Sequence, residues 1–121
     1  MWLCLSDAFL SIVHKDCDAD ELLVRARREG DIETVFPAAE VRKTIGNDYL
    51  YRAVIKRSVV AEAMTRLAME GVDYPNFKNT VRDNKLHSAF NRIWHVIADL
   101  QVIPPYSQPA RLPRRQRGAR S

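Results

Sequence analysis

Short apolar runs, each a few residues long and separated by turn-forming residues, dominate the first half of this chain. Residues 2–5 and 8–14 are two such runs, split by Ser6 and Asp7. β-Rich runs joined by a short polar turn predict a β-hairpin. Both faces of the second run are largely apolar, so we expect that strand to lie in the interior of a sheet.

A third strand is expected over residues 21–28, where apolar side chains occupy every second position. Such alternation is typical of a strand with one buried and one mostly solvated face. The expected buried set is Leu22, Val24 and Ala26, and the opposite face carries Leu23, Arg25 and Arg27.

A second hairpin is predicted from residues 40–45 and 49–56. The turn between them, residues 46–48, reads Gly-Asn-Asp. Gly46 and Asn47 are the residue types that supply the positive φ of tight hairpin loops.

Three helices are expected. Asp31 is a suitable N-cap for a short helix that Pro37 ends, and Ser58 for a helix that reaches about Glu70. Asp83 can cap the longest helix, residues 84–101. The apolar stripe of that helix has helical spacing and consists of Leu86, Phe90, Ile93, Ile97 and Leu100.

The predicted element order is therefore β-β-β-α-β-β-α-α. Strands grouped in hairpins, without regular βαβ alternation, predict an α+β fold. We expect a two-layer sandwich, with an antiparallel sheet of about five strands and helices on one face.

Charge is divided unevenly along the chain. Residues 1–101 hold 14 Lys and Arg against 15 Asp and Glu, whereas residues 102–121 hold five arginines and no acid. We interpret 1–101 as a single domain and 102–121 as a disordered Pro/Arg-rich tail. The tail could bind nucleic acid phosphates, grip an acidic protein, or be a solvated end with no specific role. Its arginines are Arg111, Arg114, Arg115, Arg117 and Arg120.

Metal and cofactor sites are not predicted. The acids in residues 16–20 alternate as in a calcium loop, but Glu21 stands where such a loop needs Gly and Arg27 where it needs a bidentate Glu. His14 and Cys17 supply only two candidate zinc ligands, so a solvated turn is the favoured interpretation.

Catalytic residues are not predicted either. His95 and Asp99 are four residues apart on the long helix. This spacing is typical either of a helix-surface pair or of a general base with its orienting carboxylate. No recognisable nucleophile motif accompanies them, so the surface pair is favoured. We expect a protein that is not an enzyme.

Two tyrosines on one strand give the remaining candidate site. Tyr49 and Tyr51 are expected on the same face, with the basic residues Arg52, Lys56 and Arg57 nearby. Alternating aromatics on a strand stack bases in RNA-binding sheets, but the same stripe is typical of a core-facing strand. Core packing is the favoured interpretation.

The cellular compartment is predicted from the cysteines and the N-terminus. Cys4 and Cys17 are too few for a disulfide framework, so a reduced pair is expected. Asp7 interrupts the first apolar run before a signal peptide could form, and no run is long enough to span a bilayer. A cytoplasmic protein without membrane association is expected.

Several stretches together resemble a group of small bacterial and prophage-borne proteins of unassigned function, over roughly residues 1–105. They are Met1-Trp2-Leu3, Asp7 to Val13, Leu22 to Arg27, Gly30 to Glu33, Val35-Phe36-Pro37, Tyr51 to Val54 and Asp73 to Lys78. The Arg-rich end looks peculiar to this chain.

Small α+β proteins of that kind include anti-CRISPR inhibitors. The resemblance implies a non-enzymatic protein that binds a host protein or ribonucleoprotein complex stoichiometrically. The alternative function is nucleic-acid binding through the tail.

Overall fold

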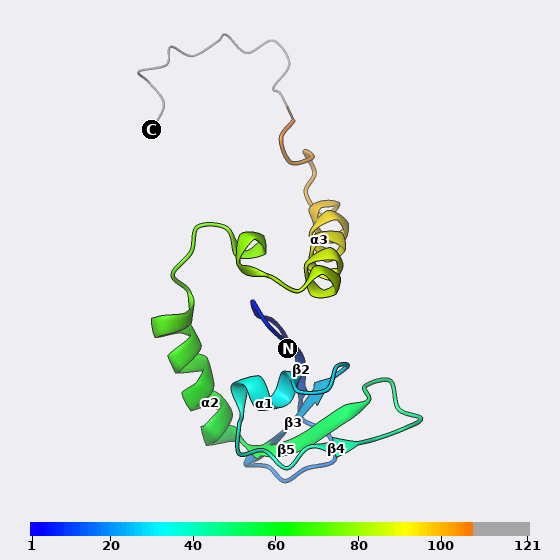
Figure 1. Ribbon diagram of the computed structural model, residues 1–121, viewed down its shortest axis with the longest axis vertical. Coiled ribbons are helices and arrows are strands. Elements are labelled where there is room, and N and C mark those ends of the chain that lie inside the picture. Colours follow the sequence, from blue (N-terminus) through cyan, green and yellow to red (C-terminus); the bar gives the residue numbers. More distant parts are fainter. Residues whose placement is uncertain (108–121) are drawn as a thin grey trace. The chain divides into compact units, whose positions relative to one another are not determined.

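The computed structural model describes residues 1–107 and contains the predicted antiparallel sheet of five strands (Figure 1). The five tail arginines, Arg111, Arg114, Arg115, Arg117 and Arg120, lie outside the described residues. The strands are β1 (Trp2–Cys4), β2 (Phe9–Val13), β3 (Glu21–Ala26), β4 (Arg42–Lys43) and β5 (Tyr51–Lys56). The helices are α1 (Asp31–Val35), α2 (Arg57–Arg66) and α3 (Asn84–Ala98), with a π-helical turn at Leu67–Gly71 and a 3-10 helix at Phe77–Thr80. The predicted α+β class is confirmed.

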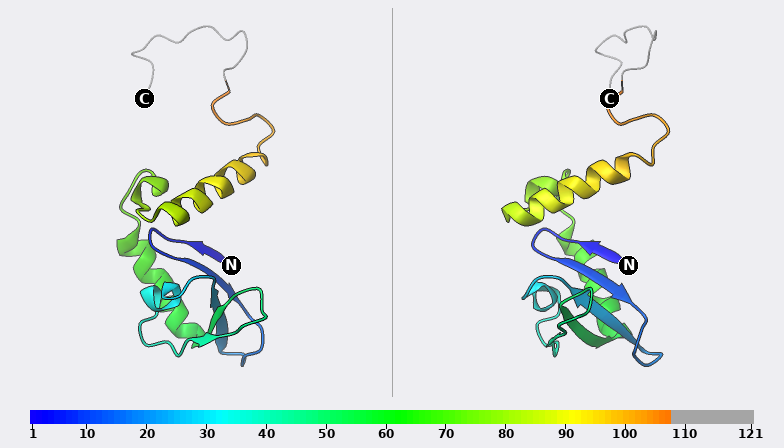
Figure 2. Two further views of the ribbon diagram at one scale, coloured as in Figure 1. Left: turned by 45° about the vertical axis from the view of Figure 1, so that its right-hand side comes forward. Right: turned by 90° about the vertical axis from the view of Figure 1, so that its right-hand side faces the viewer.

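The strand order is β1-β2-β3-β5-β4, and every neighbouring pair is antiparallel. The β1–β2 hairpin, drawn in blue, forms one edge of the sheet (Figure 2). β2 is an interior strand, as its two apolar faces predict. The chain passes through α1 and β4 between β3 and β5, yet it is β5 that pairs with β3. This crossover brings residues 21–26 directly against residues 51–56.

The core lies between one face of the sheet and the helices α1 and α2, which both contact β3 and β5. Every second residue of a strand points into this core, because successive side chains leave a strand on opposite faces. They meet the apolar side chains of the two helices. The buried cluster consists of Leu10, Ile12, Val24, Ala26, Ile32, Val35, Phe36, Ala53, Ile55, Val60 and Ala63.

The contacts divide the chain into two units, Met1–Asn91 and Arg92–Ser121. In the first unit, Phe90 from the start of α3 meets Phe9 of β2 with ring centroids 6.3 Å apart. In the second, the ring of Tyr106 stacks on that of Trp94, with centroids 6.2 Å apart.

Asp31 does not cap α1, contrary to the sequence prediction. Gly30 is the N-cap, at a φ of 91° that favours glycine. Asp31 is the first helical residue and is only 4% exposed. Its Oδ2 accepts the Phe9 N–H at 3.1 Å and the Arg28 Nε–H at 3.2 Å, and its Oδ1 accepts from Arg28 Nη2 at 3.0 Å. The carboxylate therefore ties β2 to α1 instead of capping a helix.

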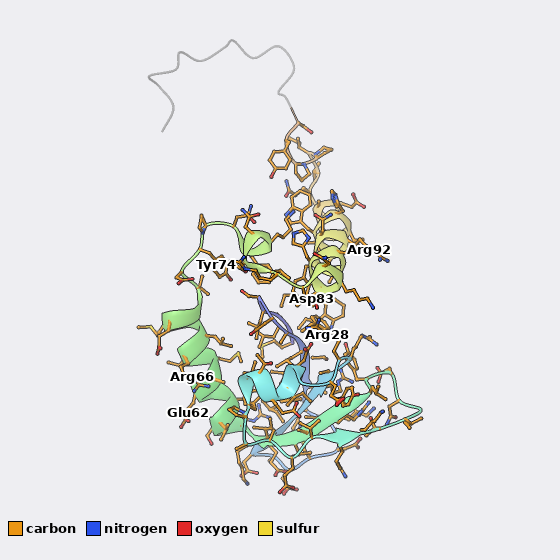
Figure 3. All side chains as sticks on the ribbon, in the orientation of Figure 1. Arg28, Glu62, Arg66, Tyr74, Asp83 and Arg92 are labelled. Carbon is orange, nitrogen blue, oxygen red and sulfur yellow. The ribbon has the colours of Figure 1, made fainter. Side chains whose placement is uncertain are left out.

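Arg28 continues this connection to the start of α3. Its Nη1 lies 3.6 Å from Asp83 Oδ1, and Figure 3 shows the two labelled residues side by side. Asp83 caps α3 as predicted, since its Oδ1 accepts the Leu86 N–H at 2.9 Å. That bond lowers the pKa of the Asp83 carboxyl, because it favours the charged form.

The other predicted helix boundaries need correction. α2 begins at Arg57, directly after β5, and Ser58 lies inside it without a capping hydrogen bond. α3 ends at Ala98, so the apolar stripe outlasts the helix and Leu100 is 78% exposed. In the second hairpin only Gly46 has positive φ, and the strand before it shrinks to the two residues of β4.

Candidate nucleic-acid interface

Three arginines lie opposite one another on three neighbouring strands. The register pairs Arg25 of β3 with Arg52 of β5, and Arg52 with Arg42 of β4. Neighbouring strands are about 4.8 Å apart, so the three side chains start from one line across the sheet. We call Arg25, Arg52 and Arg42 the arginine row.

The arginine row lies on the face of the sheet that α1 and α2 do not cover. Val24, Ala26 and Ala53, which alternate with Arg25 and Arg52, belong to the buried cluster on the helix side. The side chains of Arg25 and Arg52 must therefore leave the strands on the opposite face. Leu23 on that same face is only 3% exposed, which corrects its predicted solvated position.

The loop before β5 folds against this basic face. Tyr49 is only 4% exposed, and its ring centroid lies 4.5 Å from the Arg25 Cζ and 4.2 Å from the Arg27 Cζ. Cation–π attraction to the electron-rich ring holds each of the two guanidinium groups against Tyr49. Tyr49 thus gathers positive charge beside the row.

One acid of the same loop meets these arginines. The Asp48 carboxylate accepts from Arg52 Nη2 at 3.1 Å, and its main-chain oxygen accepts from Arg27 Nη1 at 2.8 Å. Arg25 Nη2 instead donates to the neutral hydroxyl of Ser11 at 2.7 Å. Within residues 1–107, Arg25, Arg27 and Arg42 form no ion pair with a carboxylate.

Hydrogen-bond donors are left over in the row itself. Within residues 1–107, the buried side-chain nitrogen and oxygen atoms without a hydrogen-bond partner are Arg25 Nε and Arg52 Nε. Buried polar groups nearly always find a partner in a folded protein. Both exceptions therefore belong to neighbouring members of one cationic row.

Like charges directly opposite on a sheet destabilise it, by about 0.2–1 kcal/mol a pair. The row places two such pairs side by side, Arg25 with Arg52 and Arg52 with Arg42. An anion lying across the strands would remove this repulsion and accept from guanidinium N–H groups, because each guanidinium carries five of them. The chemistry that fits this face is the binding of a phosphate-rich polymer.

The sequence-predicted site residues fall into different places. Tyr51 packs against the core cluster as favoured, but Tyr49 lies under the arginines, so the two rings do not share a face. Arg52 is a member of the row, whereas Lys56 pairs with Asp20 at 2.9 Å. The predicted hairpin places Arg42 near Arg52, but Arg25 joins them only because β5 pairs with β3, and the sequence does not predict that pairing.

The acidic loop after β2 is held by its own contacts. His14 Nε2 lies 3.1 Å from the Asp18 main-chain oxygen, and Cys17 Sγ donates to the Glu21 main-chain oxygen at 3.5 Å. One carboxylate oxygen each of Asp18, Asp20 and Glu21 falls within 4.8 Å of the others. The Lys56 ammonium binds Asp20 and lowers the pKa of that carboxyl, so it already supplies a cation there.

His95 and Asp99 make separate contacts on and after α3. The His95 ring lies edge-on to the Trp94 ring at 5.1 Å, and the Asp99 N–H donates to the Val96 oxygen. In the part of the chain that the structure describes, no hydrogen bond or ion pair joins His95 to Asp99. The pair that the spacing predicts is not formed.

Both cysteines are free thiols, and burial raises the pKa of Cys4. Within residues 1–107, no helix has both the length and the apolar character needed to cross a bilayer. Comparison with protein-family models, with curated proteins and with solved structures finds no match to this chain.

Proposed function

We propose that this protein binds nucleic acid through the face of its sheet that carries the arginine row and acts without catalysis. The observation that supports this proposal is the arginine row, three cations in register across β3, β5 and β4. Lys and Arg side chains that neutralise phosphates release counterions, which is the main source of sequence-independent affinity for nucleic acid. Arg27 extends the basic surface beside the row.

The sheet and the tail make different predictions for the same assay. Binding of a labelled oligonucleotide is measured over a salt series, with RNA and DNA strands as separate arms. Arg42→Gln should weaken binding and reduce the slope of log K against log salt by about 0.7–0.9, the value of one lost phosphate contact. Lys43→Gln is the matched control, because Lys43 is also exposed but lies one position along β4, on the other face.

The tail is tested in the full chain by changing Arg111, Arg114, Arg115, Arg117 and Arg120 to Gln together. If the sheet carries binding, adding Arg42→Gln to this five-site variant should weaken binding as much as it does in the wild-type chain. If the five-site variant loses all binding and Arg42→Gln alone has no effect, the activity belongs to the tail and the sheet proposal is refuted.

A second proposal is the stoichiometric inhibitor role predicted from the sequence resemblance. It is favoured by an open strand edge: in the described part of the chain, β4 pairs only with Tyr51 and Arg52 of β5. Beyond that pairing, Val54 and Lys56 border a cavity of about 380 Å³ between β5, α2 and the segment after α1. Unpaired strand edges beside apolar side chains accept an added strand from a partner.

This second proposal has its own test. A host complex recovered with the protein from lysate should be lost with Val54→Lys, since a charged side chain beside an open strand edge opposes strand addition. Retention of the partner by that variant would contradict an edge-bound complex. A ribonucleoprotein partner would satisfy both proposals, and Arg42→Gln and Val54→Lys would then weaken binding independently.

A further inference from the structure

An exposed tryptophan stands at the far end of the arginine row. The β1–β2 register pairs Trp2 with Ser11, and the β2–β3 register pairs Ser11 with Arg25. Trp2, Ser11, Arg25, Arg52 and Arg42 therefore form one continuous line across all five strands. Trp2 is 64% exposed, whereas an apolar side chain of this size is usually mostly buried.

The backbone and the ring of Trp2 are both held in place. The Leu3–Leu10 pairing follows on one side, and the Ile12 N–H donates to the Met1 oxygen at 2.8 Å on the other. The indole meets the ring of Phe9 edge-on, with centroids 5.7 Å apart and planes at 75°. An edge contact supports the ring without covering a whole face, so an indole face remains open for stacking.

A small polar residue, Ser11, joins the tryptophan to the arginines. Ser11 is 1% exposed, and its hydroxyl accepts a hydrogen bond from Arg25 Nη2 at 2.7 Å, which holds that guanidinium on the side of the row toward Trp2. Two strand spacings separate Trp2 from Arg25, roughly 10 Å, which is about three stacked nucleotides at about 3.4 Å each. The line thus offers an aromatic platform at one end and cations at the other, at the spacing of a short run of nucleotides.

We infer that the ligand of this face is a single strand, with its phosphates along the arginine row and an unpaired base stacked on Trp2. This inference rests on the proposed nucleic-acid function and specifies its substrate class. In a duplex the faces of the bases are already stacked on one another, so an indole gains a base only from an unpaired strand. Because every base has a π-face, stacking on Trp2 tolerates any sequence.

The test compares three full-length proteins with two forms of one oligonucleotide. Wild type, Trp2→Ala and Trp2→Phe are titrated with a single strand of about 12 nucleotides, within the site sizes of single-strand binders, and with its duplex. Trp2→Ala should weaken single-strand binding by about 5- to 150-fold, the loss expected for one stacked base. Trp2→Phe should recover most of that loss, and the salt slope should stay unchanged because no phosphate contact is removed.

Two controls keep a folding defect separate from a binding defect. Urea unfolding of Trp2→Ala reports whether the hairpin is intact, and Val59→Ala removes a comparably exposed apolar side chain from α2, at 43% exposure, without touching the line. Val59→Ala should bind as wild type does.

The possible failures are distinguishable. If Trp2→Ala binds the single strand as tightly as wild type while Arg42→Gln still weakens it, the inference is wrong and the proposed function stands. Equal affinity of wild type for duplex and single strand also overturns it. If neither nucleic acid binds, or if polyglutamate binds more tightly than both, the proposed function fails as well.

Discussion

Arg25 of β3 and Arg52 of β5 lie directly opposite one another, and each has a buried Nε without an acceptor among the described residues. A fold selected for stability alone would place opposite charges at such a pair, because cross-strand ion pairs stabilise a sheet and like charges weaken it. The arrangement instead resembles an active surface whose stability is completed by its ligand. Proteins commonly sacrifice stability at functional sites in this way.

Replacing Arg42 should separate stability from binding. Arg42→Gln removes one of the two like-charge contacts of the row, so the free energy of unfolding should stay unchanged or rise by up to about 1 kcal/mol. The same variant should bind nucleic acid more weakly than wild type. Urea unfolding and the salt-series titration measure the two effects. A variant that loses stability in parallel with binding would show that Arg42 is structural.

Tyr49 should stabilise the basic face through its ring. Tyr49→Leu removes both cation–π contacts, with Arg25 and Arg27, and should lower the free energy of unfolding by about 1–3 kcal/mol. Tyr49→Phe keeps the aromatic face and is the matched control, which should stay close to wild type in denaturant unfolding. Equal losses in the two variants would assign the effect to the hydroxyl group instead.

Asp31 should be among the most sensitive polar positions of the first unit. Asp31→Ala leaves the Phe9 N–H without its acceptor and removes the carboxylate from Arg28. Unsatisfied buried donors are costly, so we expect a loss of about 2–3 kcal/mol in urea unfolding. Glu33→Ala, two residues along α1 at an exposed position, is the control and should cost little. A small effect of Asp31→Ala would mean that β2 and α1 are held together by apolar packing alone.

The fold was predictable where the pattern is local. The apolar run of residues 8–14, the alternation in 21–28 and the Asp83 cap all depend on neighbours within a few residues. The structure has strands at Phe9–Val13 and Glu21–Ala26 and confirms the cap. Asp31 was wrongly predicted as a cap because its true partners are distant in sequence. Gly30 takes the cap position, while Asp31 turns inward to the Phe9 N–H, 22 residues away.

The candidate site was less predictable because it depends on strand order. Arg42 and Arg52 belong to the two strands of the predicted hairpin, but Arg25 becomes their neighbour only because β5 pairs with β3. A one-residue change of register would move each side chain to the other face. Tyr49 was wrongly placed for a different reason. It lies two positions before Tyr51, so strand alternation would put both rings on one face. Because Tyr49 precedes β5, alternation does not fix the direction of its side chain.

Acid should loosen the start of α3 through Asp83. The folded state lowers the pKa of this carboxyl below its ordinary value of 3.8, first through the hydrogen bond from the Leu86 N–H and also through the charge of Arg28. A carboxyl with a depressed folded pKa stabilises the fold at pH values above the unfolded pKa. That stabilisation is lost as the pH falls from about 3.8 through the lower folded value. NMR can follow the backbone amide shifts of residues 84–87 from about pH 6 downward. These shifts should report the loss of the Asp83 cap below pH 3.8. Asp83→Asn keeps an oxygen acceptor at the N-cap but does not titrate, so its shifts should lack this acid step. An identical acid step in Asp83→Asn would place the responsible proton on another group.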